Sequence, residues 1–267
     1  MKRREFLLTS MAAGAGALVS TSTASAADSS ETPAREFYEL RLYHLRRGPQ
    51  TSRFDDFYKN AAIPAMNRAG ISRVGVFSVM IGPDSPTMYV LLPHASIESV
   101  ATANERVHSD PEYLKAGAEF VNAPATDPSY VRVESSLMVA FTGFPKLEQP
   151  PASAAKKARI FELRTYESHS YKANQQKIEK FNTAEIAIFR RTGLQPVFFG
   201  QTMIGSRLPN LTYMLLHEDM AAHDRAWAAF GADPEWQKVR NAPGSKDSDI
   251  VSSISNLFLK PAAYSQI

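Results

Sequence analysis

The sequence contains no cysteine, and this absence excludes several kinds of site together. Without thiols the chain has no disulfide, no zinc–thiolate or iron–sulfur centre and no thiol nucleophile. The sequence also lacks a Gly-rich phosphate loop and the G-x-S-x-G pattern, so it gives no support to a nucleotide site or a serine hydrolase triad. A chain without free thiols suits an oxidising compartment.

Strong net charge and long apolar runs are missing as well. The formal net charge of the 267 residues is +3, and basic residues at the extreme N-terminus account for most of it. No other basic run occurs, which argues against a nucleic-acid partner. No segment has the roughly 20 apolar residues of a membrane span. Because 44% of the residues are hydrophobic, we expect a folded chain with a sizeable core and no membrane span after processing.

Residues 1–26 have the pattern of an export signal peptide. A basic start precedes an apolar stretch and a small-residue cleavage motif, so cleavage should fall between Ala26 and Ala27. The string RREFL is similar to a twin-arginine signal, with Arg3 and Arg4 as the pair. We therefore expect the twin-arginine machinery as a partner and a periplasmic or extracellular location. Retention of this segment as a membrane anchor is the alternative.

Most of the remaining chain consists of an internal repeat in two copies. Residues 36–83 and 159–206 align without gaps, and they share the motif Glu-Leu-Arg-x-Tyr near their starts. Further along, SDPEYLK (109–115) matches ADPEWQK (232–238). Self-similarity over most of each half indicates a duplicated domain. The expected organisation is a signal peptide (1–26), a disordered leader (27–34), a first domain (35–143), a Pro-rich linker (144–158) and a second domain (159–261).

Each copy predicts the order strand, helix, strand, strand, helix, strand. This βαββαβ order is that of a ferredoxin-like domain, whose helices cover one face of the sheet and leave the other uncovered. A second copy can cover the exposed face by packing sheet on sheet, often as a closed barrel. We therefore predict an α+β fold in which two tandem ferredoxin-like domains form a pseudo-dimeric α/β barrel.

The repeated motif supplies the candidate site residues. Side chains alternate along a strand, and we expect the leucine face to meet the helices and the Glu-Arg-Tyr face to point into the barrel lumen. An insertion of one residue aligns MYVLL (88–92) with TYMLL (212–216). This alignment adds one tyrosine from each copy to the candidate site. The candidate ligand-binding residues of the lumen are Glu39, Arg41, Tyr43, Tyr89, Glu162, Arg164, Tyr166 and Tyr213.

Two interpretations of these residues stay open. In the structural one, each Glu–Arg pair is a salt bridge that orients the two sheets. In the functional one, arginine holds an acidic or carbonyl group, glutamate acts as a base and tyrosine donates a hydrogen bond. The six histidines show no metal-site spacing, and none is expected to repeat at a matching position. We therefore expect neither a metal nor a cofactor.

The sequence resembles the NIPSNAP family. The resemblance rests on FYELRLYHL and IFELRTYE, on AAIPAMNRAGI and EIAIFRRTGL, and on SDPEYLK and ADPEWQKV, and it covers nearly the whole mature chain in two copies. It implies the dimeric α/β-barrel superfamily fold, whose members include cofactor-independent monooxygenases and haem enzymes. The family has no settled catalytic residues to carry over to this chain.

Three functions therefore remain as hypotheses. The first is binding of a small apolar or acidic molecule in the lumen, and the second is a cofactor-independent oxygenase or isomerase that uses a lumen glutamate and tyrosine. The third is an interaction module whose interior is filled by side chains. Neither the ligand nor further self-association of the chain follows from the sequence.

Overall fold

The computed structural model describes residues 34–244 and 246–267. The expected signal peptide with Arg3 and Arg4, and its cleavage between Ala26 and Ala27, lie outside the described residues, as does most of the expected leader. Within the described part of the chain, none of the helices combines the length and apolarity that a membrane crossing requires.

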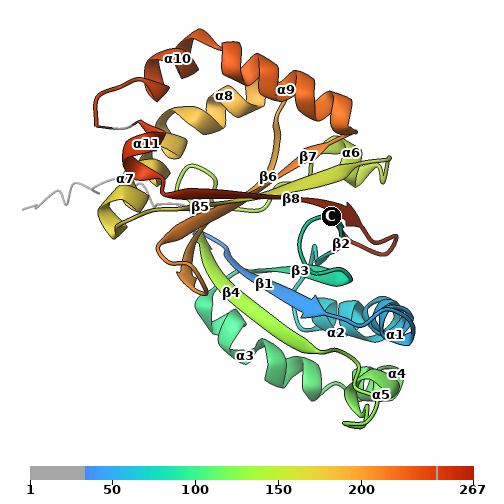
Figure 1. The fold of residues 1–267 in the computed structure, drawn as a ribbon. Coiled ribbons are helices and arrows are strands. Elements are labelled where there is room, and N and C mark those ends of the chain that lie inside the picture. The colour runs from blue at the N-terminus through green and yellow to red at the C-terminus, as the bar shows by residue number, and fades with distance from the viewer. Residues whose placement is uncertain (1–33, 245) are drawn as a thin grey trace, which may run out of the picture. The chain divides into compact units, whose positions relative to one another are not determined.

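The strands form one closed antiparallel barrel (Figure 1). The strand order around the barrel is β1-β3-β2-β8-β5-β7-β6-β4. The strands are β1 (Phe37–His44), β2 (Gly75–Ile81), β3 (Thr87–His94), β4 (Arg132–Ala140), β5 (Ile160–Glu167), β6 (Gln195–Ile204), β7 (Asn210–His217) and β8 (Ser253–Pro261).

Each repeat contributes one ferredoxin-like sheet to the barrel. The orders β4-β1-β3-β2 and β8-β5-β7-β6 are equivalent, and the barrel closes where an edge strand of one sheet pairs with an edge strand of the other. These two seams are β2–β8 and β4–β6. At the β4–β6 seam the backbones approach so closely that a Cβ on Gly200 would lie 2.8 Å from Met138 Cβ. The predicted α+β barrel of two tandem ferredoxin-like domains is confirmed.

The helices lie outside the strands, with those of each repeat against its own sheet (Figure 1). The first repeat contains α1 (Pro49–Phe57), the π-helical segment η1 (Tyr58–Ala62), α2 (Ile63–Arg68), α3 (Ile97–His108), α4 (Pro111–Ala116) and α5 (Ala118–Val121). The second contains α7 (Tyr171–Lys180), the π-helical segment η2 (Phe181–Glu185), α8 (Ile186–Arg191), α9 (Met220–Ala232), α10 (Pro234–Arg240) and α11 (Asp247–Ile250), and α6 (Pro151–Ala154) lies between the repeats.

The matching Asp-Pro motifs begin matching helices. Asp110 caps α4 and Asp233 caps α10, and each carboxylate accepts two backbone N–H groups of the first turn. The proline that follows each aspartate occupies the first helical position, where its missing N–H costs nothing. Tyr113 and Trp236, three residues after each cap, are buried.

A π-helical segment occurs at the same place in the first helix of both repeats. Pro64 lies just after η1, and a proline ring inside a helix commonly breaks or kinks it. The helix instead continues directly from η1 into α2. Because η2 occurs in the second repeat, where Ala187 takes the place of the proline, Pro64 is not the cause of the π-helical geometry.

Three hydrophobic clusters hold the fold together. One lies between the first sheet and its helices, another between the second sheet and its helices, and the third fills one end of the barrel interior. In the third cluster the rings of Phe77 and Phe161 lie 4.9 Å apart, and Tyr38 packs against Phe198 at 5.0 Å. One end of the lumen is therefore closed by aromatic side chains from both repeats.

The connection between the repeats helps to close that end. Leu147 and Ala152 are buried in the same interior cluster. The carboxylate of Glu36 accepts a hydrogen bond from the backbone N–H of Leu147 and pairs with Arg73 at 2.5 Å. The stretch expected to be a Pro-rich linker (144–158) thus packs against the barrel.

Replacing Phe161 with alanine tests this packing. The side chain is fully buried, and removing a buried aromatic ring from a core costs about 3–5 kcal/mol. We expect urea denaturation to show a free energy of unfolding lower by that amount. Tyr171→Ala is the control, because Tyr171 is 66% exposed and its loss should cost less than about 0.5 kcal/mol. Equal stability of the two variants would contradict a packed lumen end.

Candidate functional site

The repeated Glu-Arg-Tyr face lies on the side of the sheet opposite to the one expected. Leu40 and Leu163 belong to the cluster inside the barrel, whereas Tyr43 and Tyr166 pack with the helices. The lumen assignment of Glu39, Arg41, Tyr43, Glu162, Arg164 and Tyr166 is therefore wrong. The physical reason is that both faces of each sheet are buried, so that the apolar residues of the strand do not identify the helix side.

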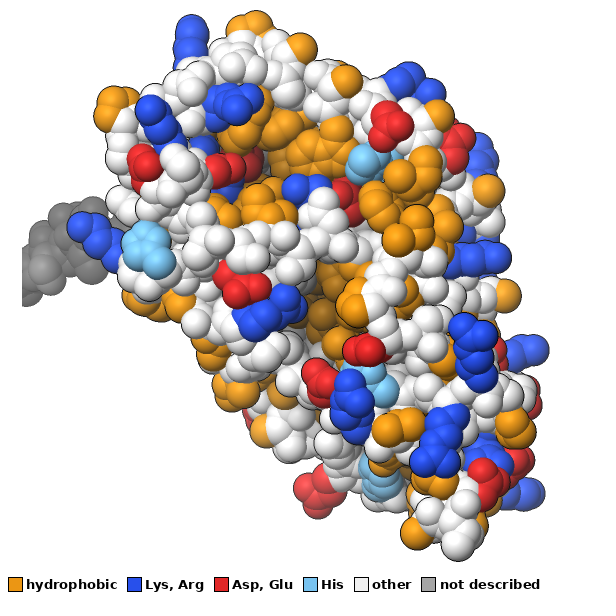
Figure 2. Space-filling model, viewed as in Figure 1, with side chains coloured by type: hydrophobic (Ala, Val, Ile, Leu, Met, Phe, Trp, Pro, Cys, Tyr) orange, Lys and Arg blue, Asp and Glu red, His pale blue; other side chains and the backbone are white. Residues whose placement is uncertain are grey.

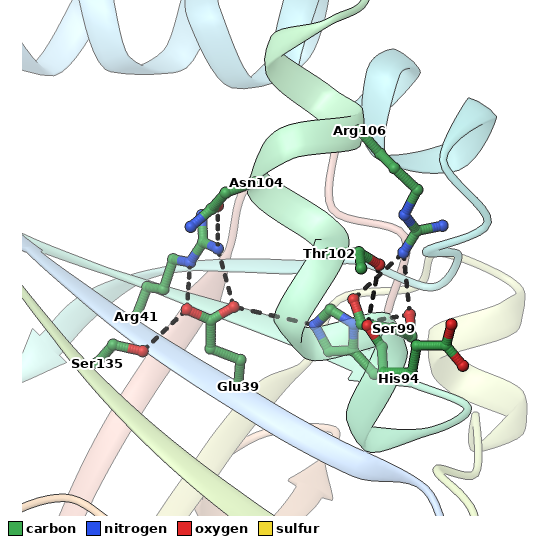
Figure 3. Close-up of polar contacts among 9 residues, drawn as sticks. Glu39, Arg41, His94, Ser99, Thr102, Asn104, Arg106 and Ser135 are labelled. Carbon is green, nitrogen blue, oxygen red and sulfur yellow. Dashed lines mark hydrogen bonds and ion pairs between the residues drawn. The ribbon is translucent and has the colours of Figure 1, made fainter.

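In the first repeat the Glu–Arg pair forms a cluster between the sheet and α3 (Figure 3). Arg41 Nε and Nη2 donate to the two carboxylate oxygens of Glu39 at 2.7 and 2.8 Å. Nη2 also donates to Asn104 Oδ1 on α3, at 3.0 Å, and Ser135 Oγ donates to Glu39 Oε1 at 2.9 Å. His94 Nε2, at the end of β3, lies 3.9 Å from Glu39 Oε2. We call these five residues the first-repeat cluster.

These contacts determine the charge states of the first-repeat cluster. Burial opposes ionisation of Glu39, but the hydrogen bond and the charge of Arg41 outweigh it and lower the pKa of the carboxyl group. Burial lowers the pKa of His94, with only partial opposition from Glu39. The cluster at neutral pH is therefore an ion pair beside a neutral imidazole, and its carboxylate is a weak base.

In the second repeat the equivalent pair is more deeply enclosed. Arg164 Nη1 donates to Glu162 Oε1 at 2.5 Å, and Trp227 Nε1 donates to Glu162 Oε2 at 2.9 Å. Nε2 of His217 and Nε2 of His223 lie 3.3 and 3.6 Å from the same Oε2. The Arg164 guanidinium also lies over the Trp227 ring, 4.5 Å from its centroid. We call these five residues the second-repeat cluster.

The surroundings of Glu162 suit a partner in an ion pair better than a general acid or base. Its side chain is fully buried. Burial raises its pKa, but the hydrogen bond from His217 and the charge of Arg164 are stronger and lower the pKa to about 2. Because a carboxylate can only accept, His217 carries its proton on Nε2 when it forms this hydrogen bond. The contacts confirm a salt bridge, as in the structural interpretation of the Glu–Arg motif. The pair lies between the second sheet and α9, however, so it does not orient the two sheets.

The same cluster contains a set of atoms that could hold a metal ion. Glu162, His217 and His223 each offer one ligand atom, all within 4.8 Å of one another. Two imidazoles and a carboxylate suit a divalent transition metal. The carboxylate, however, already accepts from Arg164 and Trp227, so that its charge is compensated without a cation.

The lumen itself contains a cavity at the end not filled by aromatic rings. Its volume is about 350 Å3. We call it the lumen cavity; its lining residues are Leu40, Leu42, Pro83, Tyr89, Glu134, Ser136, Met138, Leu163, Thr165, Thr202, Ser206, Arg207, Asn210, Thr212, Ser255, Asn256 and Leu257. Of the eight predicted lumen residues only Tyr89 lies there. Figure 2 shows a hollow near the centre of one face, with hydrophobic side chains at its bottom.

Tyr89 and Tyr213, which the assumed one-residue insertion aligns with each other, do not occupy equivalent positions in the two repeats. β1 and β5 begin 123 residues apart, and so do their partners β3 and β7, so no residue is inserted between them. Thr212 is therefore the counterpart of Tyr89. Tyr213 points to the helix side, where its hydroxyl lies 3.0 Å from that of Tyr166. A shift of one residue moves a side chain to the other face of the sheet.

The same one-residue error in the alignment hid the fact that one histidine is repeated. At a constant spacing of 123 residues, His94 and His217 end matching strands, and each faces the glutamate of its own repeat. The expectation that no histidine repeats is thus wrong. The constant spacing between the Asp-Pro motifs was the signal that could have revealed this pair, since it leaves no room for an insertion.

The low pKa of Glu162 predicts a loss of stability in acid. Its value in the folded protein is about 2, against an ordinary value of 4.5. The unfolded chain takes up the proton first, so the stabilisation is complete above about pH 4.5 and is lost as the pH falls towards 2. We expect the free energy of unfolding to fall by roughly 3 kcal/mol over this window from this group alone.

Denaturant titrations over a pH series measure this effect by comparing two variants. Glu162→Gln should be less stable at neutral pH by about 3–5 kcal/mol, because Arg164 stays buried without its partner. The same variant should also lose the acid-dependent part of the stability. Glu105→Gln on the exposed face of α3 is the control, and it should follow the parent protein. An unchanged acid dependence in Glu162→Gln would refute the assignment.

Solved structures of similar fold include two bacterial proteins described as putative monooxygenases. The protein from Lactobacillus acidophilus NCFM is 7% identical, with a TM-score of 0.57 over 85% of this chain and 94% of its own. The protein from Fusobacterium nucleatum is 9% identical, with a TM-score of 0.55 over 86% of this chain and 93% of its own. At such identities the likeness is one of fold alone. Among curated proteins, none matches this chain.

Comparison with the family agrees with the duplicated architecture. An uncharacterized NIPSNAP-like domain protein from Burkholderia xenovorans is 25% identical over 40% of this chain and 89% of its own, with a TM-score of 0.37. The NIPSNAP family model matches residues 38–141 and again residues 161–266, which together make up most of the chain. The chain therefore belongs to the NIPSNAP family and contains two tandem copies of its domain.

Proposed function

We propose that this protein binds a small molecule with an apolar body and a polar or acidic head group in the barrel lumen. The observation that supports the proposal is the volume of the lumen cavity, about 350 Å3. Pockets that enclose a drug-sized ligand have volumes from roughly 300 Å3 upwards. A cavity of this size does not fit the alternative of an interaction module with a filled interior.

The lining of the lumen cavity suggests the chemistry of the ligand. Leu40, Leu42, Met138, Leu163 and Leu257 provide an apolar surface from strands of both repeats. Such a surface favours hydrocarbon over water. The body of the ligand would therefore lie among leucine and methionine side chains.

Polar groups are placed where a head group would lie. Arg207 lines the cavity, and its Nη1 donates to Ser255 Oγ at 3.1 Å and to Glu167 Oε1 at 3.3 Å, which hold it in position. Burial raises the pKa of Tyr89 to about 12 against the opposing charge of Arg207, so its phenol stays protonated and can donate. A guanidinium and a phenol together suit a carboxylate or carbonyl oxygen.

An oxygenase or isomerase that uses a lumen glutamate and tyrosine is the alternative. Two proteins described as putative monooxygenases share the fold, but Glu39 and Glu162 lie outside the lumen. Each is bound by an arginine that favours its ionised form, which weakens it as a general base. The contacts therefore favour ligand binding over general-base catalysis by these two residues.

A titration with decanoate, followed by isothermal calorimetry, tests the proposal. The wild-type protein should bind it. Leu42→Trp should abolish binding, because Leu42 is half-buried on the lumen side and a larger ring there would occupy the cavity. Arg207→Met should weaken binding of decanoate about tenfold but leave binding of decanol unchanged, since only the acid uses the guanidinium.

Ile254→Trp is the matched control. It adds a similar bulk at a β8 position that is 46% exposed and does not line the lumen cavity. Its affinity for decanoate should equal that of the parent protein. If wild-type protein does not bind decanoate, or if Leu42→Trp binds it as well as Ile254→Trp does, the ligand is not held in the lumen.

We also propose that the protein is exported by the twin-arginine route to the periplasm or beyond. The proposal depends on the basic, apolar and small-residue order of residues 1–26 with Arg3 and Arg4 as the pair. That route carries folded proteins, which suits a barrel that closes only when its two halves meet.

Cell fractionation tests the export route. In a bacterial host that has the machinery, the full chain should appear outside the cytoplasm and begin at Ala27. The double substitution Arg3→Lys, Arg4→Lys keeps the charge of the segment but removes the arginine pair, and it should retain the protein inside. Lys2→Arg is the control and should not impair export. Export of the double variant at the parental level would exclude the twin-arginine route.

A further inference from the structure

A second cavity lies between the sheet and the helices of the first repeat. Its volume is about 220 Å3. We call it the helix pocket; its lining includes Arg41, Tyr43, Phe57, Tyr58, Asn104 and Phe120. It is separate from the lumen cavity, because the two cavities lie on opposite faces of β1. The side chains of Leu40 and Leu42 line the lumen cavity, whereas those of Arg41 and Tyr43 line the helix pocket.

One end of the helix pocket is polar. Arg41 uses Nε and Nη2 to bind Glu39 and Asn104. Among the described residues Arg41 Nη1 has no acceptor, although the residue lines the pocket. Asn104 accepts through Oδ1, so its amide nitrogen is left to donate. Figure 3 shows Arg41 on β1 and Asn104 on α3 meeting at this point. These donors make a site for an anion or another acceptor.

The remainder of the pocket is aromatic. The rings of Phe57 and Phe120 are stacked 3.9 Å apart with an angle of 5°, and Tyr43 packs edge-on to Tyr58 at 5.6 Å. Burial raises the pKa of Tyr113 to about 12, with a smaller contribution from Tyr43, so this phenol is uncharged. Such walls favour a planar apolar ring, which can pack against them face to face or edge to face.

The second repeat provides an internal comparison, because the same space is filled there. At a spacing of 123 residues, larger aromatic residues replace three residues of the pocket lining: Phe189 for Met66, Trp227 for Asn104 and Phe230 for Val107. The Trp227 ring lies 4.5 Å from the Arg164 guanidinium carbon, 5.7 Å from the Phe189 ring and 5.5 Å from the Phe230 ring. An aromatic side chain thus lies against the arginine in the second repeat, at the place that the first repeat leaves open.

We propose that the helix pocket of the first repeat binds a single-ring aromatic carboxylate. The ring takes the place that the indole of Trp227 has in the second repeat, and the carboxylate accepts from Arg41 Nη1 and the amide of Asn104. The size agrees, because an apolar cavity of about 150 Å3 is enough for benzene and the helix pocket has about 220 Å3. This site does not depend on the lumen proposal, since it lies on the other face of the sheet.

Titration with benzoate, followed by ligand-observed NMR, tests the inference, and benzyl alcohol is the neutral probe. Benzoate should bind the wild-type protein, and benzyl alcohol should bind at least about tenfold more weakly because it has no charge to pair with the guanidinium. Asn104→Trp introduces the side chain of the second repeat and should abolish benzoate binding. Arg41→Lys keeps a charge but loses the planar donors, and it should weaken benzoate binding about tenfold.

Two controls complete the experiment. Leu42→Trp, which fills the lumen cavity, should leave benzoate binding unchanged, and this separates the two sites. Trp227→Asn should open the second repeat and raise the stoichiometry of benzoate from one to two. No binding of benzoate to the wild-type protein would overturn the proposal, as would retained binding in Asn104→Trp or loss of binding in Leu42→Trp. Thermal unfolding of each variant shows that it is folded.

Discussion

The closed barrel makes the alternation of side chains along each strand the constraint on which both cavities depend. Every strand has one face towards the lumen and one towards a helix layer, and both are enclosed. On β1, Leu40 and Leu42 line the lumen, while Arg41 and Tyr43 line the helix pocket. The same eight-residue strand therefore forms a wall of two chemically different spaces, and the arginine that a lumen ligand would meet is Arg207 from the turn before β7.

The two repeats share a fold and a Glu–Arg–His arrangement but differ in what covers it. Glu162 and its arginine are enclosed by Trp227 and two histidines, whereas Asn104 leaves the corresponding arginine of the first repeat open to a pocket. A duplicated chain allows this difference, since a substitution in one copy is not repeated in the other. In a symmetric homodimer each change would appear in both subunits.

The sequence was sufficient to predict the architecture but not the orientation of the strands within it. The repeat, the Asp-Pro caps and the βαββαβ order all led to the barrel that is observed. The face of Glu39 and Arg41 could not be predicted, because the leucines on the opposite face suit a barrel interior and a helix layer equally. The pairing of Tyr89 with Tyr213 failed because matching letters favoured a one-residue insertion that the backbone does not contain. The open pocket at Asn104 depends on the sizes of side chains from both strands and helices of the first repeat, which no single motif reports.

The seams β2–β8 and β4–β6 join the first repeat to the second, and both lie within one polypeptide. A barrel assembled from two separate subunits comes apart when it is diluted, and its central cavity disappears with it. Here the local concentration of one half around the other is fixed by the connection through α6. The integrity of the lumen therefore does not depend on the protein concentration.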